Sequence, residues 1–282
     1  MSSERSEVEE RPVGLTRRVS FSSGHRYWLE GLTEAENRSL FGAWASPFSH
    51  GHNYVLDVSV SGWTDMANGM VVNIKWIDDV LQEKIVRRFD QRSLNDEVDY
   101  FRMHSPSLEN LLRFIQAELT SSLPEGARLD RLKLEETPLL WGELDIDTGM
   151  VTVTRVYEFA ASHRLHSSKL THEENLELYG KCNNPAGHGH NYVLEVTVSG
   201  EPDERTGFLC DLGELDRQVN DRVVDRYDHR NLNEDLPEFK GVPTTSEILV
   251  LEVFRRLDGQ LPAKLQRVRL WETARSSFEV SA

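Results

Sequence analysis

The chain has 282 residues, and its 32 Lys and Arg against 47 Asp and Glu give a formal net charge of −15. This length suits two domains better than one, since a domain usually spans ~100–200 residues. The negative charge argues against nonspecific binding to nucleic acid or to an anionic membrane, because both need a cationic protein surface. Hydrophobic residues make up 38% of the chain, which is enough apolar material for a packed core.

The N-terminal sequence MSSERSEVEERPVG is polar and charged, without the apolar stretch of a signal peptide. We expect residues 1–14 to form a flexible tail. No part of the sequence approaches the ~18 consecutive apolar residues of a membrane-spanning helix. Two cysteines are too few for a disulfide framework, which favours a reducing compartment. These features together predict a cytoplasmic protein.

A long repeat divides the sequence into two similar halves. HGHNYVLDVSVSG begins at His50, and HGHNYVLEVTVSG begins 138 residues later at His188. A period of this length indicates a duplicated domain rather than a solenoid repeat. We therefore expect domains at residues 15–146 and 151–282. Other pairs that align at this offset, or at 136 near the end, include Phe21 with Phe159, Gly69 with Gly207, Asp90 with Asp228, Glu109 with Glu247 and Glu136 with Glu272.

Each copy predicts three strands, two helices and a last strand, in that order. Apolar residues alternate with polar ones in the strand after HGHNY, and they recur at helical spacing in the first helix. This order is typical of an antiparallel α+β domain. In the first copy the elements are strands at 18–23, 54–60 and 70–74, helices at 77–89 and 107–121, and a strand at 132–136. The second copy gives 153–161, the run after its HGHNY motif, 208–212, 215–227, 246–257 and 268–272.

Three histidines recur in each copy at the same spacing. The motif His-Gly-His places two imidazoles at i and i+2, so on a strand both project from the same face. The third histidine ends the preceding strand. Three neutral imidazoles without a thiolate suit a zinc ion with an open coordination position. We therefore expect one zinc site per copy, with ligands His25, His50 and His52 in the first and His163, His188 and His190 in the second.

The two cysteines occupy different surroundings. Cys182 lies in the loop GKCNNPAGHGH before the second histidine pair, where the first copy has Trp44. A loop thiol near a cation can act as a nucleophile or a base. Cys210 aligns with Val72 within an apolar segment, so we expect it to be a small core residue.

The combination of motifs resembles the 6-pyruvoyl-tetrahydropterin synthase family, which also contains the 6-carboxy-tetrahydropterin synthases. The second copy carries FAASH, GKCNNPAGHGHNY, DHRNLN, PTTSE and WET. The resemblance implies a T-fold in each copy, with a four-stranded antiparallel sheet and two helices. It also implies zinc on each histidine triad. Because single-domain relatives form hexamers of two stacked trimers, it implies a trimer of this two-domain chain.

The resemblance assigns roles to residues of the second copy. Cys182 would remove a proton from the substrate side chain, and Asp228 with His229 would shuttle protons. Glu272 would anchor the pterin, with Thr245 and Glu247 in the segment that helps to hold the ring. The implied reaction is a lyase reaction that converts 7,8-dihydroneopterin triphosphate to 6-pyruvoyl-tetrahydropterin and eliminates triphosphate. Arginines or lysines near the site, or a bound Mg²⁺, would have to hold the triphosphate in so acidic a protein.

The first copy departs from this pattern at the proton-transfer groups. It keeps its three histidines and the candidate pterin-binding residues Glu109 and Glu136, but has Trp44 for the cysteine and Gln91 for the second-copy imidazole. We expect this half to bind zinc without catalysing the reaction, and to act as scaffold or to complete a neighbour's active site.

Three alternatives stay open from the sequence. Five residues separate Cys182 from His188, a spacing that resembles the pyruvoyl-forming enzymes, whereas the 6-carboxy-tetrahydropterin synthases of deazaguanine and queuosine biosynthesis usually have a shorter gap. A non-catalytic protein that binds zinc and pterin would explain the degenerate first copy. A zinc hydrolase would explain three histidines and an open coordination position.

Overall fold

A computed structural model describes residues 11–282, which form two units. Of the described residues, unit 1 comprises those up to Val153 together with Gly200–Cys210, and unit 2 comprises Thr154–Ser199 and Asp211–Ala282. Most of the tail predicted at residues 1–14 lies outside the described residues. Its last two residues do not belong to a tail, because β1 already begins at Val13. In the part of the chain that is described, no helix is long and apolar enough to cross a membrane.

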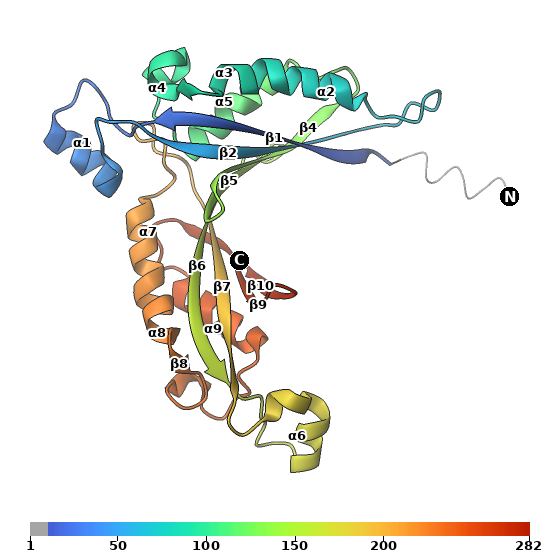
Figure 1. The fold of residues 1–282 in the computed structure, drawn as a ribbon, viewed down its shortest axis with the longest axis vertical. Helices are drawn as coiled ribbons and strands as arrows, with labels where there is room; N and C mark the ends of the chain where they lie inside the picture. Colours follow the sequence, from blue (N-terminus) through green and yellow to red (C-terminus); the bar gives the residue numbers. More distant parts are fainter. Residues whose placement is uncertain (1–10) are drawn as a thin grey trace. The chain divides into compact units, whose positions relative to one another are not determined.

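The sheet of unit 1 has four antiparallel strands and a short fifth strand, in the order β3-β1-β2-β4-β5 (Figure 1). The two-residue β3 runs parallel to β1. The strands are β1 (Val13–His25), β2 (His50–Gly62), β3 (Arg92–Ser93), β4 (Arg128–Thr137) and β5 (Leu140–Asp145).

Two long helical segments accompany this sheet, and in Figure 1 α2 and α3 run along β1 and β2. The first segment is α2 (Ile74–Leu81), a π-helical turn (Gln82–Val86) and α3 (Arg87–Phe89), and the second is α5 (Leu108–Thr120). Shorter elements are α1 (Glu34–Phe41), α4 (Leu94–Glu97) and the 3₁₀ turns Gly42–Trp44 and Asp99–Arg102.

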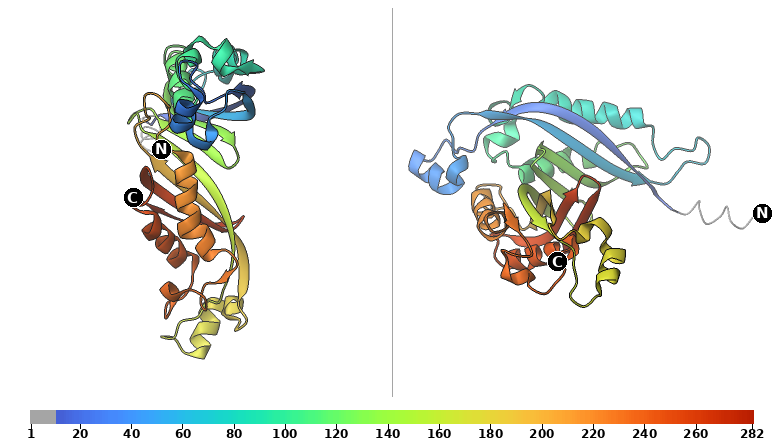
Figure 2. Two further views of the ribbon diagram at one scale, coloured as in Figure 1. Left: turned by 90° about the vertical axis from the view of Figure 1, so that its left-hand side faces the viewer. Right: turned by 60° about the horizontal axis from the view of Figure 1, so that its bottom comes forward.

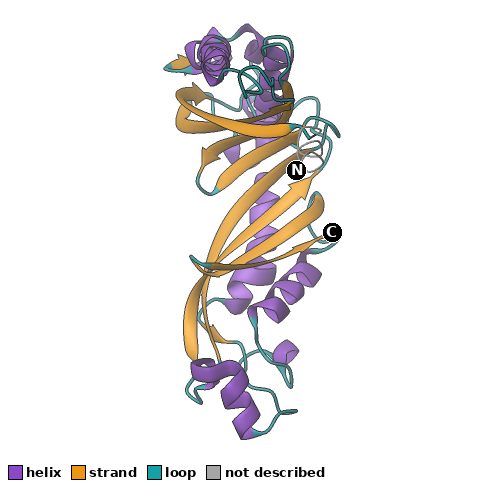
Figure 3. Ribbon diagram, turned by 90° about the vertical axis from the view of Figure 1, so that its right-hand side faces the viewer, coloured by secondary structure: helices purple, strands orange, loops and turns teal. Residues whose placement is uncertain are grey.

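Unit 2 repeats this arrangement, with strand order β10-β9-β7-β6 and a short β8 parallel to β6. Figure 2 shows α7 and α8 running along its strands, and in Figure 3 the long helices of each unit lie on one face of its sheet. The strands are β6 (Val151–His163), β7 (His188–Ser199), β8 (Arg230–Asn231), β9 (Lys264–Thr273) and β10 (Ser276–Ser281). The helices are α6 (His172–Tyr179), α7 (Leu212–Val219), a π-helical turn (Asn220–Val224), α8 (Asp225–Tyr227) and α9 (Ser246–Leu257), with 3₁₀ turns at Gly180–Asn183 and Pro237–Phe239.

The alternation in β2 decides which side chains face the helices. Tyr54, Leu56, Val58 and Val60 are all fully buried. So are the residues that recur every four positions along α2, the π-helical turn and α3, which are Ile77, Leu81, Ile85 and Phe89. Burying each such side chain contributes roughly 1.5–3 kcal/mol, so the register of β2 is strongly fixed. His52 shares the parity of Tyr54 and therefore projects to the helix-covered face at the end of the strand.

The predicted α+β class, with four antiparallel strands and two long helices per copy, is confirmed. The strands predicted at 70–74 and 208–212 are wrong, because Asn73 and Asp211 act as N-caps and start helices at the next residue. The fourth strand of each copy instead follows the last predicted strand. It is β5 in the first copy and β10 in the second. Cys210 is buried as expected, although its segment is not a strand.

The loops after the first histidine of each copy contain helices, whereas only polar loops are expected there from the sequence. Both α1 and α6 start with a capping box, in which Thr33 pairs with Glu36 and Thr171 pairs with Glu174. The pattern Thr-x-x-Glu is the sequence signal that would have revealed them.

Candidate metal centres and active site

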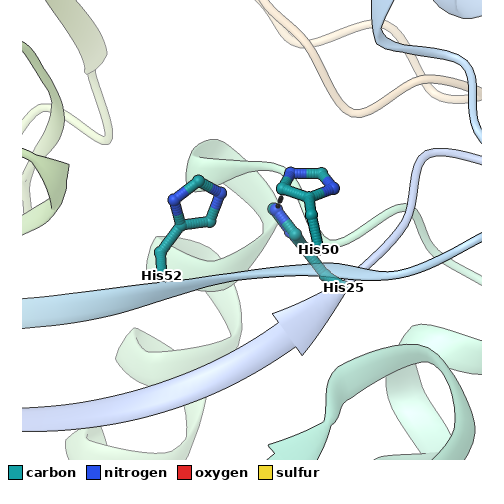
Figure 4. A group of neighbouring side chains, drawn as sticks. All are labelled: His25, His50 and His52. Carbon is teal, nitrogen blue, oxygen red and sulfur yellow. Dashed lines mark hydrogen bonds between the residues drawn. The ribbon is translucent and has the colours of Figure 1, made fainter.

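The three histidines of the first copy come together at the end of β1 and β2. His25 lies directly opposite His50 in the antiparallel ladder, and His52 follows two residues later on the same face (Figure 4). The Nε2 atoms of His25 and His50 are 3.0 Å apart. One ring nitrogen from each histidine lies within 4.8 Å of the others, so the triad could hold a metal ion.

The second triad has the same construction in unit 2. One ring nitrogen each of His163, His188 and His190 lies within 4.8 Å of the other two. His163 Nδ1 donates to the carbonyl of Thr244 at 2.7 Å, which leaves Nε2 unprotonated and directed to the group. His163 Nε2, His188 Nδ1 and His190 Nε2 are buried and have no hydrogen-bond partner within the described chain. Three converging nitrogen acceptors without donors fit a metal ion better than a hydrogen-bonded core.

Burial favours the neutral form of five triad imidazoles, which is the form that binds a metal: His25, His50, His52, His163 and His190. Burial, and after it the neighbouring His50 and His52, together lower the pKa of His25 to about 3. Burial also lowers the pKa of His52 to about 4 and lowers the pKa values of His163 and His190. Little proton release would therefore accompany metal binding near neutral pH.

A carboxylate lies beside each triad. Glu136 Oε1 is 3.5 Å from His52 Nε2, and Glu272 Oε1 is 3.8 Å from His190 Nε2. In unit 2 the hydroxyl of Ser246 donates to Glu272 Oε1 at 2.7 Å and fixes that carboxylate. Ser246 aligns with Leu108, so the first copy lacks this hydroxyl, and Ser246 is a site residue that was not predicted from the sequence.

Asp228 and His229 form a hydrogen-bonded pair, with His229 Nδ1 donating to Asp228 Oδ2 at 2.7 Å. The other carboxylate oxygen accepts from the backbone N–H of Ala160, and this bond followed by the one from His229 lowers the pKa of Asp228. His229 has a φ of +56°, a backbone conformation that glycine favours, and Gln91 of the first copy has a φ of +58°. The turn is therefore kept in both copies while the imidazole is present in one.

A surface pocket of about 610 Å³ connects this pair to the second triad, since His190 and His229 both line it. The corresponding pocket of unit 1, of about 590 Å³, is lined by His52, Gln91 and Glu136 among others. Cys182 is not among the residues that line the larger pocket.

Cys182 is half-buried in the 3₁₀ turn before β7. Its carbonyl accepts from the N–H of Leu165 at 2.9 Å, which ties the cysteine loop to the chain just after His163. The next residue, Asn183, accepts two hydrogen bonds from the guanidinium of Arg164, on its backbone oxygen at 3.0 Å and on Oδ1 at 2.8 Å. The thiol thus lies in a loop that is braced against the strand carrying His163.

The residue that replaces the cysteine in unit 1 belongs to an apolar cluster. Trp44 packs with Tyr27, Phe41 and Phe208, and the rings of Tyr27 and His25 are 4.9 Å apart. The indole Nε1 of Trp44 is buried without a hydrogen-bond partner among the residues described. The space around the first triad on this side is therefore filled by aromatic rings.

The candidate pterin-binding glutamates differ between the units. Glu109 is 2% exposed and accepts from the backbone N–H of Leu209 at 2.8 Å. Burial raises the pKa of Glu109. Glu247 is exposed and Thr245 is half-buried. The assigned roles of these residues and of the other candidate site residues stay predictions.

Comparisons with known proteins agree with the repeat. The family model described as 6-pyruvoyl tetrahydropterin synthase matches residues 14–146 and again residues 152–282. The 6-pyruvoyl tetrahydrobiopterin synthase of Poecilia reticulata is 46% identical over 122 residues, covering 43% of this chain and 83% of the relative. The human enzyme of the same name is 44% identical over 122 residues, covering 43% and 84%.

More distant relatives include the 6-carboxy-5,6,7,8-tetrahydropterin synthase of Rickettsia conorii, which is 26% identical over 143 residues, covering 45% of this chain and 95% of the relative. Among solved structures, Caenorhabditis elegans 6-pyruvoyl tetrahydropterin synthase is 42% identical, covers 47% of this chain and 96% of its own, and gives a TM-score of 0.45. Because the family model matches both halves, the chain belongs to the 6-pyruvoyl tetrahydropterin synthase family, with two copies of its domain in tandem.

Proposed function

We propose that the second domain, residues 151–282, converts 7,8-dihydroneopterin triphosphate to 6-pyruvoyl-tetrahydropterin with elimination of triphosphate. The observation that carries the proposal is the complete set of reactive groups in this copy: a histidine triad, a loop thiol and a bonded Asp–His pair. Relatives named 6-pyruvoyl tetrahydrobiopterin synthase are 42–46% identical to this chain, against 26% for those named carboxytetrahydropterin synthase. This difference and the Cys182–His188 spacing favour the pyruvoyl product.

The proposed cofactor is one zinc ion on each triad. A bound Zn²⁺ would polarise the hydroxyl oxygens of the substrate side chain and make the neighbouring C–H bonds more acidic. His163 serves this purpose in a fixed tautomer, because Thr244 accepts its Nδ1 proton. Glu272 is held nearby by Ser246, so its carboxylate can accept paired N–H bonds from the amino-pyrimidine edge of the pterin.

The protein groups then move the protons. Cys182, as a thiolate, removes a proton from the side chain of the substrate, and His229 passes protons to and from that side chain. Asp228 accepts the Nδ1 proton of His229, which directs Nε2 outward and stabilises the charged ring when it forms. Thr245 and Glu247 belong to the segment that helps to hold the ring.

The first domain, residues 15–146, serves as scaffold in this proposal. Trp44 and Gln91 cannot transfer a proton, and Glu109 is already engaged by Leu209. Its triad would hold zinc and so stabilise the fold of this domain. Glu136 lies beside His52 but takes no part in a reaction. The chain functions as a homo-oligomer, proposed to be a trimer, and Mg²⁺ accompanies the triphosphate.

Two cysteine variants test the assignment. Purified protein is incubated with 7,8-dihydroneopterin triphosphate and Mg²⁺, and products are identified by mass spectrometry. We expect 6-pyruvoyl-tetrahydropterin and free triphosphate from the wild type, none from Cys182→Ala, and an unchanged rate from Cys210→Val. Cys210 is the matched control, because it is buried and the first copy carries Val72 in its place. Full activity of Cys182→Ala would show that the thiol is not the base.

The same experiment separates the alternatives. Formation of 6-carboxy-tetrahydropterin with acetaldehyde would assign the chain to the carboxy-forming branch of the family. Zinc on both triads with no triphosphate released would favour a protein that binds zinc and pterin without catalysis.

A further inference from the structure

Arg164 and its first-copy counterpart Arg26 have the same backbone setting. The N–H of Arg164 donates to Asn233 Oδ1 at 2.7 Å, and the amide of Asn233 donates to the carbonyl of Arg164 at 3.1 Å. Arg26 makes the same bonds with Asn95, at 2.8 Å and 3.1 Å. Both arginines directly follow a triad histidine. A difference between their side chains therefore does not arise from the backbone that carries them.

The two side chains nevertheless bind different groups. Arg26 pairs with carboxylates, among them Asp96 at 2.9 Å. Arg164 donates from Nε to the carbonyl of Asn183 at 3.0 Å and from a terminal nitrogen to Asn183 Oδ1 at 2.8 Å. Glu234 aligns with Asp96 and lines the same cavity as Arg164, yet the two form no ion pair in the described structure. The arginine of the second copy therefore holds the residue after the cysteine, although a carboxylate is close by.

Asn183 passes this constraint on to His166. A guanidinium has only donors, so the Asn183 atom bonded to Arg164 is the oxygen, and the amide nitrogen lies on the other side. That nitrogen is 3.3 Å from His166 Nδ1. Because the amide nitrogen only donates, Nδ1 accepts, and the neutral ring carries its proton on Nε2. Asn183 is 2% exposed, so little water can replace these bonds. We name Arg164, Asn183 and His166 the bracing chain.

The bracing chain encloses the backbone bond of the cysteine. The carbonyl of Cys182 accepts from the N–H of Leu165 at 2.9 Å. Leu165 lies between Arg164 and His166 in the sequence, and both of these side chains bind Asn183, the residue after Cys182. The position of the thiol relative to the end of β6 therefore depends on the bracing chain.

The far end of the cysteine loop is fitted to the same strand. Gly187 has a φ of +71°, and a Cβ on it would lie 3.0 Å from the carbonyl oxygen of His163. Both features favour glycine at this position. The first copy has Ser49 there. The loop is thus held against the triad strand at both ends in the second copy.

The copy without the thiol also lacks the bracing chain. At the 138-residue offset, three polar positions of the second copy correspond to apolar residues of the first: Cys182 to Trp44, Asn183 to Ala45 and His166 to Trp28. The sheet and the histidine triad form in the first copy without these polar groups. Neither the fold nor the triad requires them, and their joint absence links them to the cysteine.

We propose that Arg164, Asn183 and His166 are positioning residues that hold the thiol of Cys182 in one place beside the second triad. The catalytic consequence rests on the proposed function, in which this thiol removes a proton from the substrate. A displacement of about 1 Å at a reacting group can lower a rate roughly 10²-fold. Arg164 is required in this role for its fixed fork of donors, which a lysine cannot reproduce.

Steady-state kinetics of triphosphate release separate positioning from substrate binding. Asn183→Ala introduces the residue of the first copy, and we expect kcat to fall roughly 10²-fold with KM and zinc content unchanged. Arg164→Lys keeps the charge without the paired bonds, so its kcat should fall as well. Arg26→Lys is the matched control in the first copy and should leave both constants unchanged. A raised KM with the wild-type kcat in Arg164→Lys and Asn183→Ala would show that these residues only bind substrate, which contradicts the proposal.

The role of His166 is tested by a conservative variant. His166→Asn retains an acceptor close to the place of Nδ1, whereas His166→Leu removes it. We expect His166→Asn to keep most of the wild-type kcat and His166→Leu to lose it. Equal rates of the two variants would show that the bond from Asn183 does not position the thiol.

A measurement without turnover tests the position of the thiol directly. In a Cys210→Val background, Cys182 is labelled with a trifluoroacetonyl group and observed by ¹⁹F NMR. We expect one narrow resonance when the bracing chain is intact, and a broadened or split one when Asn183→Ala is added. Identical spectra with and without Asn183→Ala would overturn the positioning role. A wild type that releases no triphosphate would instead contradict the proposed function, and the spectra would still decide whether the bracing chain holds the thiol.

Discussion

Acidification of the metal-free protein is expected to weaken unit 1 through His25. This side chain is 0% exposed, and its pKa is lowered from 6.5 to about 3. Below pH 6.5 the unfolded chain therefore binds more protons than the folded chain. The contribution of neutral His25 to the free energy of unfolding is complete above pH 6.5 and declines as the pH falls towards 3.

The size of the effect follows from the difference in pKa. For each pH unit between the two pKa values, the free energy of unfolding falls by about 1.4 kcal/mol. A change from pH 7.5 to pH 5.0 covers about 1.5 pH units of this range, from 6.5 to 5.0. His25 alone therefore accounts for a loss of about 2 kcal/mol in the free energy of unfolding. His52, whose pKa is lowered to about 4, acts in the same direction.

Urea unfolding of chelator-treated protein at both pH values measures this loss. His25→Gln cannot titrate, so its stability should fall by about 2 kcal/mol less than that of the wild type between the two pH values. The comparison between pH values removes any constant cost of the substitution. His104→Gln, at an exposed histidine, should keep the wild-type pH dependence. Equal pH dependence of His25→Gln and wild type would refute the reasoning.

Three further outcomes are expected. Asp228→Asn should lower the rate of triphosphate release by roughly 10²–10⁴-fold, since it removes the acceptor of the His229 proton, while Asp90→Asn in the first copy should leave the rate unchanged. Metal analysis should find two zinc ions per wild-type chain and one in His163→Ala; two in that variant would contradict the site. Trp44→Cys should not gain activity in a Cys182→Ala background, and a measurable rate would contradict the scaffold role.

Much of the fold could be predicted because its signals are local and occur twice. Alternation in β2 and the helical spacing of Ile77, Leu81, Ile85 and Phe89 reflect burial on one face, and the structure buries them all. The strands predicted near residues 72 and 210 failed for a physical reason. A short apolar run before a helix has the sequence pattern of a strand. Whether the chain forms a helix there depends on the side chain that caps the helix N-terminus.

The histidines that come together in the site could be predicted from the sequence, but the hydrogen bonds that join its other residues could not. The spacing of the histidine triads predicted that their nitrogen atoms would converge, and they do. The Ser246–Glu272 bond and the docking of Leu209 on Glu109 join segments 26 and 100 residues apart. No periodicity encodes such contacts, because they depend on how the elements pack. Comparison of the copies could have indicated Ser246, where Leu108 shows that the hydroxyl is not needed for the fold.

The same comparison bears on the charge of the protein. Arg26, which follows the first-copy triad histidine, is paired with Asp96 at 2.9 Å and with Glu30 at 3.1 Å. Its counterpart Arg164 has no carboxylate within ion-pair distance in the described structure and is instead oriented by the neutral Asn183. Arg164 lines a cavity of about 300 Å³. The second domain therefore has an arginine, next in sequence to His163, that no ion pair within residues 11–282 neutralises, in a cavity that Glu234 also lines. The net charge of −15 is therefore compatible with a triphosphate substrate, because local pairing determines the potential at the site.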